Sequence, residues 1–323
     1  MTALLNEVLG EPVPIGTDRV SVRAVAGFVS VTARESAATS LIAAAKSAAD
    51  DAARQEKRVV AGHLDDQVQA RRERVLAEVA RIHDKLDNER LLLRCQKIIP
   101  LKADTALGPQ YEILLSIHDS QGQLIPAVDF VRAAEQYNRM QDVDRWVVGR
   151  VLDWMVANRS RIESLGGISI NLSGHSLNDE VLLEYIFEKL THFDCPLDKI
   201  TFEITEASAI TQLADVVDFI NELHEYGAHF CLGNFGTGVS SVQFLKQLPV
   251  DMIKIDGSFI RDLHTDKNDQ LMVRSMTEMA HFLGKEVVAP HVEHREVVTT
   301  LKMLGVDYAQ GFHIERPRQL DTL

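Results

Sequence analysis

Acidic, amide and lysine side chains recur at the ends of short apolar runs in the second half of this sequence. One run, 229–232, is followed by Gly233 and Asn234, and another, 252–255, carries Lys254. Parallel α/β folds bring the carboxyl ends of their strands to one face, so these side chains are expected to converge there. The candidates are Gln96, Glu112, Asn171, Glu203, Glu206, Asn234, Lys254, Asp256, Glu293 and Gln310.

Carboxylate and amide oxygens gathered at one place suit a hard divalent cation. Glu112, Asn171 and Glu203 would be enough to hold one ion. A lysine beside them, Lys254, would stabilise a phosphate or orient a water molecule. The pattern predicts metal-assisted phosphoester hydrolysis. A single buried Glu or Asn is as often structural, so the prediction depends on their joint placement.

The elements that would position these residues alternate along the chain from residue 91 onward. Eight apolar runs predict strands at 91–99, 111–117, 168–172, 200–204, 229–232, 252–255, 286–289 and 308–312. Helical patterns lie between them, at 130–157, 181–192, 213–226, 241–247, 269–283 and 295–304. Polar residues follow nearly every strand instead of gathering at one switch point, which favours a (β/α)8 barrel over an open doubly wound sheet.

The sequence before this barrel predicts two further parts. Residues 1–63 form a small α/β segment, with strands at 20–25 and 27–31 and a helix over 37–56. These few elements are too small to form a hydrophobic core of their own. The segment is therefore expected to pack on another body or on a second copy of itself. Residues 64–90 form a helical linker whose apolar positions follow heptad spacing, and residues 91–323 form the barrel. The linker pattern fits a coiled-coil seam and a single amphipathic helix equally well.

Composition excludes several classes of protein. A net charge of -13 argues against a DNA-binding protein, which normally carries a basic stripe. The three cysteines share no CxxC spacing, so neither a disulfide framework nor a zinc site is expected. No 18-residue apolar run and no signal-peptide pattern is present, so we expect a cytoplasmic protein without direct membrane insertion.

Six ordered motifs carry a resemblance to a known family. They are Tyr111-Glu112-Ile113-Leu114, Ser169-Ile170-Asn171-Leu172-Ser173, Phe202-Glu203-Ile204-Thr205-Glu206, Asn234-Phe235-Gly236-Thr237-Gly238, Lys254-Ile255-Asp256-Gly257-Ser258-Phe259 and Tyr308-Ala309-Gln310-Gly311-Phe312. Over about residues 86–320 the chain resembles the EAL domain. This resemblance implies a TIM-like barrel that hydrolyses cyclic di-GMP with two divalent metal ions.

The resemblance also implies a role for each matching residue. Glu112, Asn171 and Glu203 match metal ligands, Lys254 matches a lysine near the attacking water, and Glu206 matches a glutamate that anchors the active-site loop. The residues expected to line the ligand site are Gln96, Glu112, Leu114, Asn171, Glu293 and Gln310.

Departures from the family pattern change the expected function. Gly233 and Asn234 stand where active members have two aspartates, and Pro290 stands where they have a glutamate. His291, which could ligate a transition metal, replaces a glycine, and Ser116 replaces an arginine that contacts phosphate. Without three carboxylates, two dications would not be held about 4 Å apart. The metal ligands Glu112, Asn171 and Glu203 and the catalytic residues Lys254 and Glu206 are therefore expected to be vestigial, with no cofactor required.

The leading hypothesis is a catalytically inactive EAL-like signalling module that acts by partner binding, with or without cyclic di-GMP as its ligand. One alternative is a weak or altered cyclic di-GMP phosphodiesterase, the only case that would need Mg2+ or Mn2+. The other is a structural dimerisation module, with a protein partner or a second copy bound through the linker helix and the barrel. Residues 1–63 resemble the C-terminal end of a GGDEF domain without its signature motif, so cyclase activity is not expected.

Overall fold

The computed structural model divides the chain into two compact units, 1–78 and 79–323. Each unit is described by itself. The structure describes residues 13–15, 18–20, 26–29, 45–46, 48–49, 59–62, 91–102, 108–118, 124–177, 179–193, 196–211, 213–238 and 242–323.

In the first unit, two short strand pairs are described. β1 (Val13–Ile15) runs antiparallel to β2 (Asp18–Val20), and β3 (Ala26–Val29) runs parallel to β4 (Val59–Gly62). Of the helix expected over 37–56, residues 45–46 and 48–49 are described and are helical. The helical linker predicted over 64–90 lies outside the described residues.

The second unit is a closed barrel, which confirms the predicted fold class. Eight of its described strands close the ring because β5 pairs with both β6 and β13. These strands are β5 (Leu91–Pro100), β6 (Gln110–His118), β8 (Gly167–Asn171), β9 (Ile200–Thr205), β10 (His229–Phe235), β11 (Met252–Ile255), β12 (Glu286–Ala289) and β13 (Tyr308–Gln310). Two short strands, β7 (Leu124–Pro126) and β14 (Arg318–Gln319), pair antiparallel with β6 and β5.

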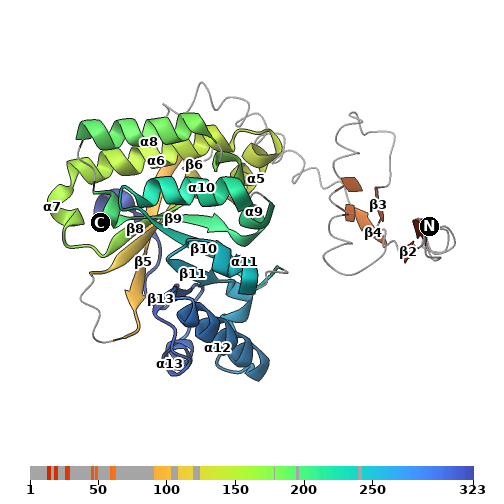
Figure 1. The fold of residues 1–323 in the computed structure, drawn as a ribbon. Helices are drawn as coiled ribbons and strands as arrows, with labels where there is room; N and C mark the ends of the chain where they lie inside the picture. The colour runs from red at the N-terminus through yellow and green to blue at the C-terminus, as the bar shows by residue number, and fades with distance from the viewer. Residues whose placement is uncertain are drawn as a thin grey trace. The chain divides into compact units, whose positions relative to one another are not determined.

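Helices cover the outer face of these strands (Figure 1). They are α5 (Val128–Gln136), α6 (Met140–Ala157), α7 (Arg159–Ile162), α8 (Glu180–Phe193), α9 (Glu206–Thr211), α10 (Leu213–His224), α11 (Val242–Gln247), α12 (Lys267–Phe282) and α13 (Arg295–Met303). Strands covered on both faces read as continuous apolar runs, and all four residues of β11 are buried. No helix among the described residues is long and apolar enough to span a membrane.

Helix α12 shows how local sequence sets these elements. Asp266 caps its start, because its side chain accepts hydrogen bonds from the backbone N–H groups of Asn268 at 2.7 Å and Asp269 at 3.2 Å. Just past its end, Gly284 takes a φ of 72°, a left-handed conformation that glycine adopts without steric cost.

Two details of the barrel did not follow from the sequence pattern. The first strand, β5, is antiparallel to both of its neighbours within the predicted closed barrel. The helix predicted over 130–157 is two helices, α5 and α6, separated at residues 137–139. Asn138 has a φ of 52° there, and asparagine is one of the few residues that adopt this left-handed conformation readily.

Two aspartates tie the strands together at their amino-terminal ends. Asp251 accepts a hydrogen bond from the Phe230 N–H at 2.7 Å and lies 3.1 Å from His224 Nε2. Asp307 accepts a hydrogen bond from the Val287 N–H at 2.8 Å and lies 2.7 Å from His281 Nε2. This end of the barrel is closed by charge-assisted backbone bonds.

Candidate functional site

The ammonium group of Lys254 occupies the centre of the barrel mouth. Its Nζ lies 2.6 Å from Glu112 Oε2 and 2.8 Å from Glu203 Oε2. The three side chains come from β11, β6 and β9, and all three are buried. One buried cation therefore bridges two buried carboxylates, at the place where the sequence predicted metal ligands.

Glu112 is fully engaged by protein donors. Besides the Lys254 ammonium, its Oε1 accepts a hydrogen bond from Asn171 Nδ2 at 2.8 Å, and its Oε2 accepts one from Gln310 Nε2 at 2.7 Å. The sequence predicted that Asn171 is a vestigial metal ligand. In the structure, its amide nitrogen donates to the Glu112 carboxylate.

Burial and the shared ammonium shift the pKa values of this group in different directions. Burial alone would raise the pKa of Glu112, but the Lys254 charge and the bonds from Lys254, Asn171 and Gln310 outweigh it and hold this pKa below its ordinary value. Burial, together with the nearby negative charge of Glu112, raises the pKa of Glu203 to about 7. The charge and the hydrogen bond of Lys254 act in the opposite direction but do not outweigh them. Burial would lower the pKa of Lys254, but the two carboxylates raise it above its ordinary value.

Two glutamines extend the network toward the C-terminal segment. Gln310 Nε2 also donates to Gln96 Oε1 at 3.2 Å, and Gln96 Nε2 donates to the Glu315 carbonyl oxygen at 3.0 Å. Gln310 is 3% exposed, and its Oε1 has no hydrogen-bond partner among the described residues. A buried acceptor without a partner is costly, so this oxygen is the point at which the described network is left unsatisfied.

Glycine at position 233 matches the space around it. A Cβ atom there would lie 2.7 Å from Glu203 Oε1, so the Glu203 side chain fills the place that an aspartate would need. The next residue, Asn234, is exposed and has a φ of 54°. In this arrangement, β10 contributes no carboxylate to the mouth.

The loop after β12 also lacks a carboxylate at the expected place, because Pro290 stands there. His291 follows with a φ of 56°, and its ring lies against Gly257. Burial and the positive charges of Arg261 and Lys254 lower the pKa of His291, which favours a neutral imidazole. A backbone hydrogen bond joins this loop to β13: the Val292 N–H donates to the backbone carbonyl oxygen of Gln310 at 2.9 Å.

The remaining predicted site residues lie outside this network. Glu206 is 2% exposed, and its Oε2 accepts a hydrogen bond from the Gly236 N–H at 3.0 Å, which holds the loop after β10. Glu293 is exposed. Leu114 faces Arg94 across the β5–β6 pair.

The side chains present do not fit a pair of divalent metal ions. Glu112 and Glu203 share an internal cation, and Gly233, Asn234 and Pro290 supply no further charge. Among the described residues, no three histidine, cysteine or carboxylate side chains gather into a metal site. What the mouth offers instead is a carboxylate pair bridged by one ammonium group and surrounded by amide groups.

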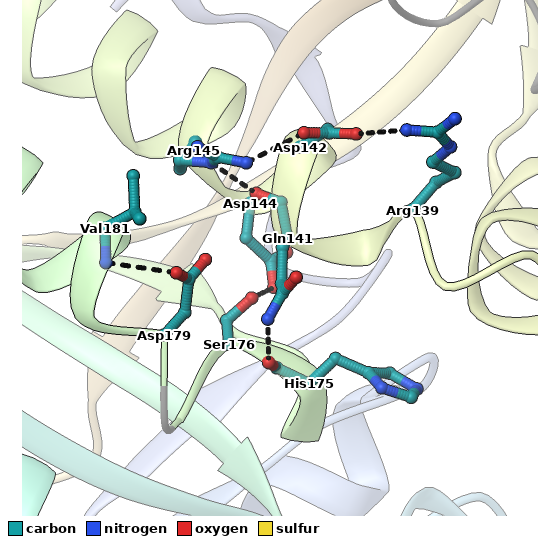
Figure 2. A network of polar contacts seen from close by, with 9 residues as sticks. All are labelled: Arg139, Gln141, Asp142, Asp144, Arg145, His175, Ser176, Asp179 and Val181. Carbon is teal, nitrogen blue, oxygen red and sulfur yellow. Dashed lines mark hydrogen bonds and ion pairs between the residues drawn. The ribbon is translucent and has the colours of Figure 1, made fainter.

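Sequence reasoning missed Asp144, a buried carboxylate on α6 that holds the loop after Asn171. Its Oδ2 accepts hydrogen bonds from Ser176 Oγ at 2.6 Å and from the Ser173 N–H at 2.9 Å. Figure 2 shows Asp144 pointing from α6 to Ser176, with Gln141 reaching the His175 carbonyl beside it. A charged residue within the otherwise apolar buried face of a helix pattern was the available signal.

Comparison with known proteins assigns the chain to a family. Residues 79–317 match the EAL domain. The chain belongs to the EAL domain family. Its closed barrel and its six motifs agree with this assignment.

Two curated relatives of this EAL domain carry enzyme names. The chain is similar to "Cyclic di-GMP phosphodiesterase PdeB" of Shewanella oneidensis, with 36% identity over 240 residues, covering 74% of this chain and 28% of that protein. It is also similar to "Cyclic di-GMP phosphodiesterase PdeF" of Escherichia coli, with 30% identity over 249 residues, covering 77% of this chain and 33% of that protein. The chain thus spans about a third of the length of these relatives.

A solved structure shares the fold. The EAL domain of FimX from Pseudomonas aeruginosa, solved bound to cyclic di-GMP, superposes with a TM-score of 0.68 at 28% identity, covering 76% of this chain and 96% of that domain. This EAL domain is therefore related both to proteins named as phosphodiesterases and to a domain solved with the dinucleotide bound.

Proposed function

We propose that this EAL domain binds cyclic di-GMP without hydrolysing it and signals through the bound state. The observation that carries the proposal is the bridge from Lys254 to Glu112 and Glu203. The single ammonium group in contact with both carboxylates offsets one of their two negative charges and competes with a divalent ion for the same oxygens. Hydrolysis in this family's usual way needs the metals to generate the nucleophile and clamp the phosphate.

Support for ligand binding comes from the amide groups and from the structural relative. Gln96, Asn171 and Gln310 surround the two bridged carboxylates, and Gln310 Oε1 is unpaired among the described residues. The FimX domain, 28% identical, was solved with cyclic di-GMP. Amide donors and acceptors recognise a nucleotide without requiring a metal ion.

A weak phosphodiesterase is the second candidate, favoured by the 36% identity to PdeB and by the presence of Glu112, Asn171, Glu203 and Lys254. It would require Lys254 to release one carboxylate to a metal ion. The N-terminal unit is further inferred to be a remnant of a GGDEF domain, on the pattern of residues 20–60.

Calorimetric titration with cyclic di-GMP, run in Mg2+ and repeated in chelator, tests the proposal together with timed product analysis. We expect saturable binding in both buffers and no linear dinucleotide. Absence of binding in both buffers would overturn the proposal that this domain is a cyclic di-GMP receptor. Linear dinucleotide formed in Mg2+ or Mn2+ and abolished by chelator would establish the second candidate instead.

A further inference from the structure

Arg94 lies on the face of β5 that points into the barrel. Side chains alternate along a strand, so Arg94 shares a face with Gln96, which is part of the site network. Across the β5–β6 pair, Gln96 stands opposite Glu112, and Arg94 stands opposite Leu114. The side chain of Arg94 is half-buried.

The position of this pair places the Arg94 side chain nearer the mouth than the site network. β6 runs parallel to β8, so residues later in β6 lie closer to the carboxyl ends of the strands. Leu114 therefore lies one inward position above Glu112, and the next pair is Leu92 with Ser116. No carboxylate occurs at these upper inward positions of the two strands, and the nearby Glu315, on the segment before β14, is paired with Arg318.

The described hydrogen bond of Arg94 goes to the backbone. Its Nη2 donates to the Pro317 carbonyl oxygen, which fixes one edge of the guanidinium. By contrast, Arg139 and Arg145 both pair with Asp142, and Arg318 pairs with Glu315. A guanidinium has five N–H donors, so several remain for an anion.

Glu112, which lies below Arg94, is already engaged by other donors. Its oxygens accept hydrogen bonds from the Lys254 ammonium, which Glu203 shares, and from two amide groups. An arginine above a carboxylate that is engaged in this way keeps donors for a second anion, and its planar fork matches two phosphate oxygens.

We propose that Arg94 binds the non-bridging oxygens of a ligand phosphodiester and is the residue by which this mouth recognises phosphate without a metal ion. The inference rests on the proposed cyclic di-GMP binding. Guanidinium donors that the Pro317 carbonyl does not occupy would contact one phosphate of the dinucleotide, while the amides of Gln96 and Gln310 lie below it.

The test compares Arg94→Gln, Arg94→Lys and Lys97→Ala by calorimetric titration with cyclic di-GMP in chelator, at low and high NaCl. Gln can keep a donor for the Pro317 carbonyl while it removes the charge, and Lys keeps the charge while it removes the fork. Lys97 lies on the opposite face of the same strand and serves as the matched control. Urea unfolding of each variant shows whether it folds like the wild type.

We expect Arg94→Gln to weaken binding by about tenfold or more, the effect of losing a charged hydrogen bond. Arg94→Lys should fall between it and the wild type, and Lys97→Ala should match the wild type. The affinity of the wild type should also decrease with salt more steeply than that of Arg94→Gln, a change that a purely structural bond to Pro317 would not produce. A folded Arg94→Gln protein with the affinity and salt dependence of the wild type would overturn the role of Arg94 but not the proposed binding of cyclic di-GMP. A wild type that does not bind the dinucleotide would overturn both.

Discussion

Glu203 Oε1 stands 2.7 Å from the point where a Cβ atom at Gly233 would be. Gly233 on β10 and Glu203 on β9 therefore depend on each other, because the Glu203 carboxylate occupies the space that a side chain at position 233 would need. Lys254 holds the other oxygen of Glu203 at 2.8 Å. A cation of the protein itself therefore offsets part of the negative charge at the mouth.

Replacing Lys254 with Met should destabilise the domain strongly. The change leaves two buried carboxylates without their shared cation, which we expect to lower the unfolding free energy by about 3 to 5 kcal/mol. Urea denaturation measures the effect, with the exposed Lys246→Met as control. Adding Glu112→Gln and Glu203→Gln should recover part of the loss, and a triple variant no more stable than Lys254→Met would contradict the bridging role.

Introducing a methyl group at position 233 should be costly for one specific reason. Gly233→Ala places its Cβ against Glu203 Oε1, so we expect a loss of about 1 to 3 kcal/mol by urea denaturation. A double-mutant cycle with Glu203→Ala should show a favourable coupling, because truncating Glu203 frees the space. Additive effects of the two changes would show that the glycine is needed for another reason.

Stability should depend on the ionisation of Asp144. Burial raises its pKa from 3.8 to about 6, so the folded protein holds this proton more tightly than the unfolded chain does. The unfolding free energy should therefore be greatest below the unfolded value and fall as pH rises through about 6, by on the order of 3 kcal/mol. Glu203, with a pKa raised to about 7, acts in the same direction.

Asp144→Asn isolates the contribution of Asp144 to this pH dependence. The variant should lose that part of the pH dependence between pH 4 and 7 while Glu203 still supplies its own, as measured by urea denaturation across that range. Ser164→Ala, at an exposed serine, is the matched control. A wild type and an Asn variant with parallel pH curves would show that Asp144 does not titrate as described.

Restoring carboxylates should restore a metal site. In the triple variant Gly233→Asp, Asn234→Asp and Pro290→Glu, added charge should draw Glu203 away from Lys254 and toward a metal ion. We expect Mn2+ to raise the melting temperature of the triple variant and not that of the wild type, because an ion that binds only the folded state stabilises the folded state. The double variant Gly233→Asn and Pro290→Gln, which keeps the native Asn234, controls for side-chain volume, and a Mn2+ response in that control would count against the charge explanation.

Much of the barrel could be predicted because strands buried on both faces appear in the sequence as short, mostly apolar runs. The runs at 252–255 and 286–289 became β11 and β12 with unchanged bounds. The direction of a strand leaves no trace in such a run, so the antiparallel β5 could not be recognised. The division between α5 and α6 was also hidden, because the apolar period continues past Asn138.

The sequence by itself determined which residue types reach the mouth, because Glu112, Asn171, Glu203 and Lys254 follow from the ends of predicted strands. It also determined that Gly233, Asn234 and Pro290 bring no carboxylate. Only the tertiary structure decided the pairing, since a lysine 142 positions from Glu112 becomes its 2.6 Å partner through barrel closure. Whether a buried carboxylate faces a metal ion or an ammonium group depends on distances of a few ångströms between strands, and spacing along the chain does not encode them.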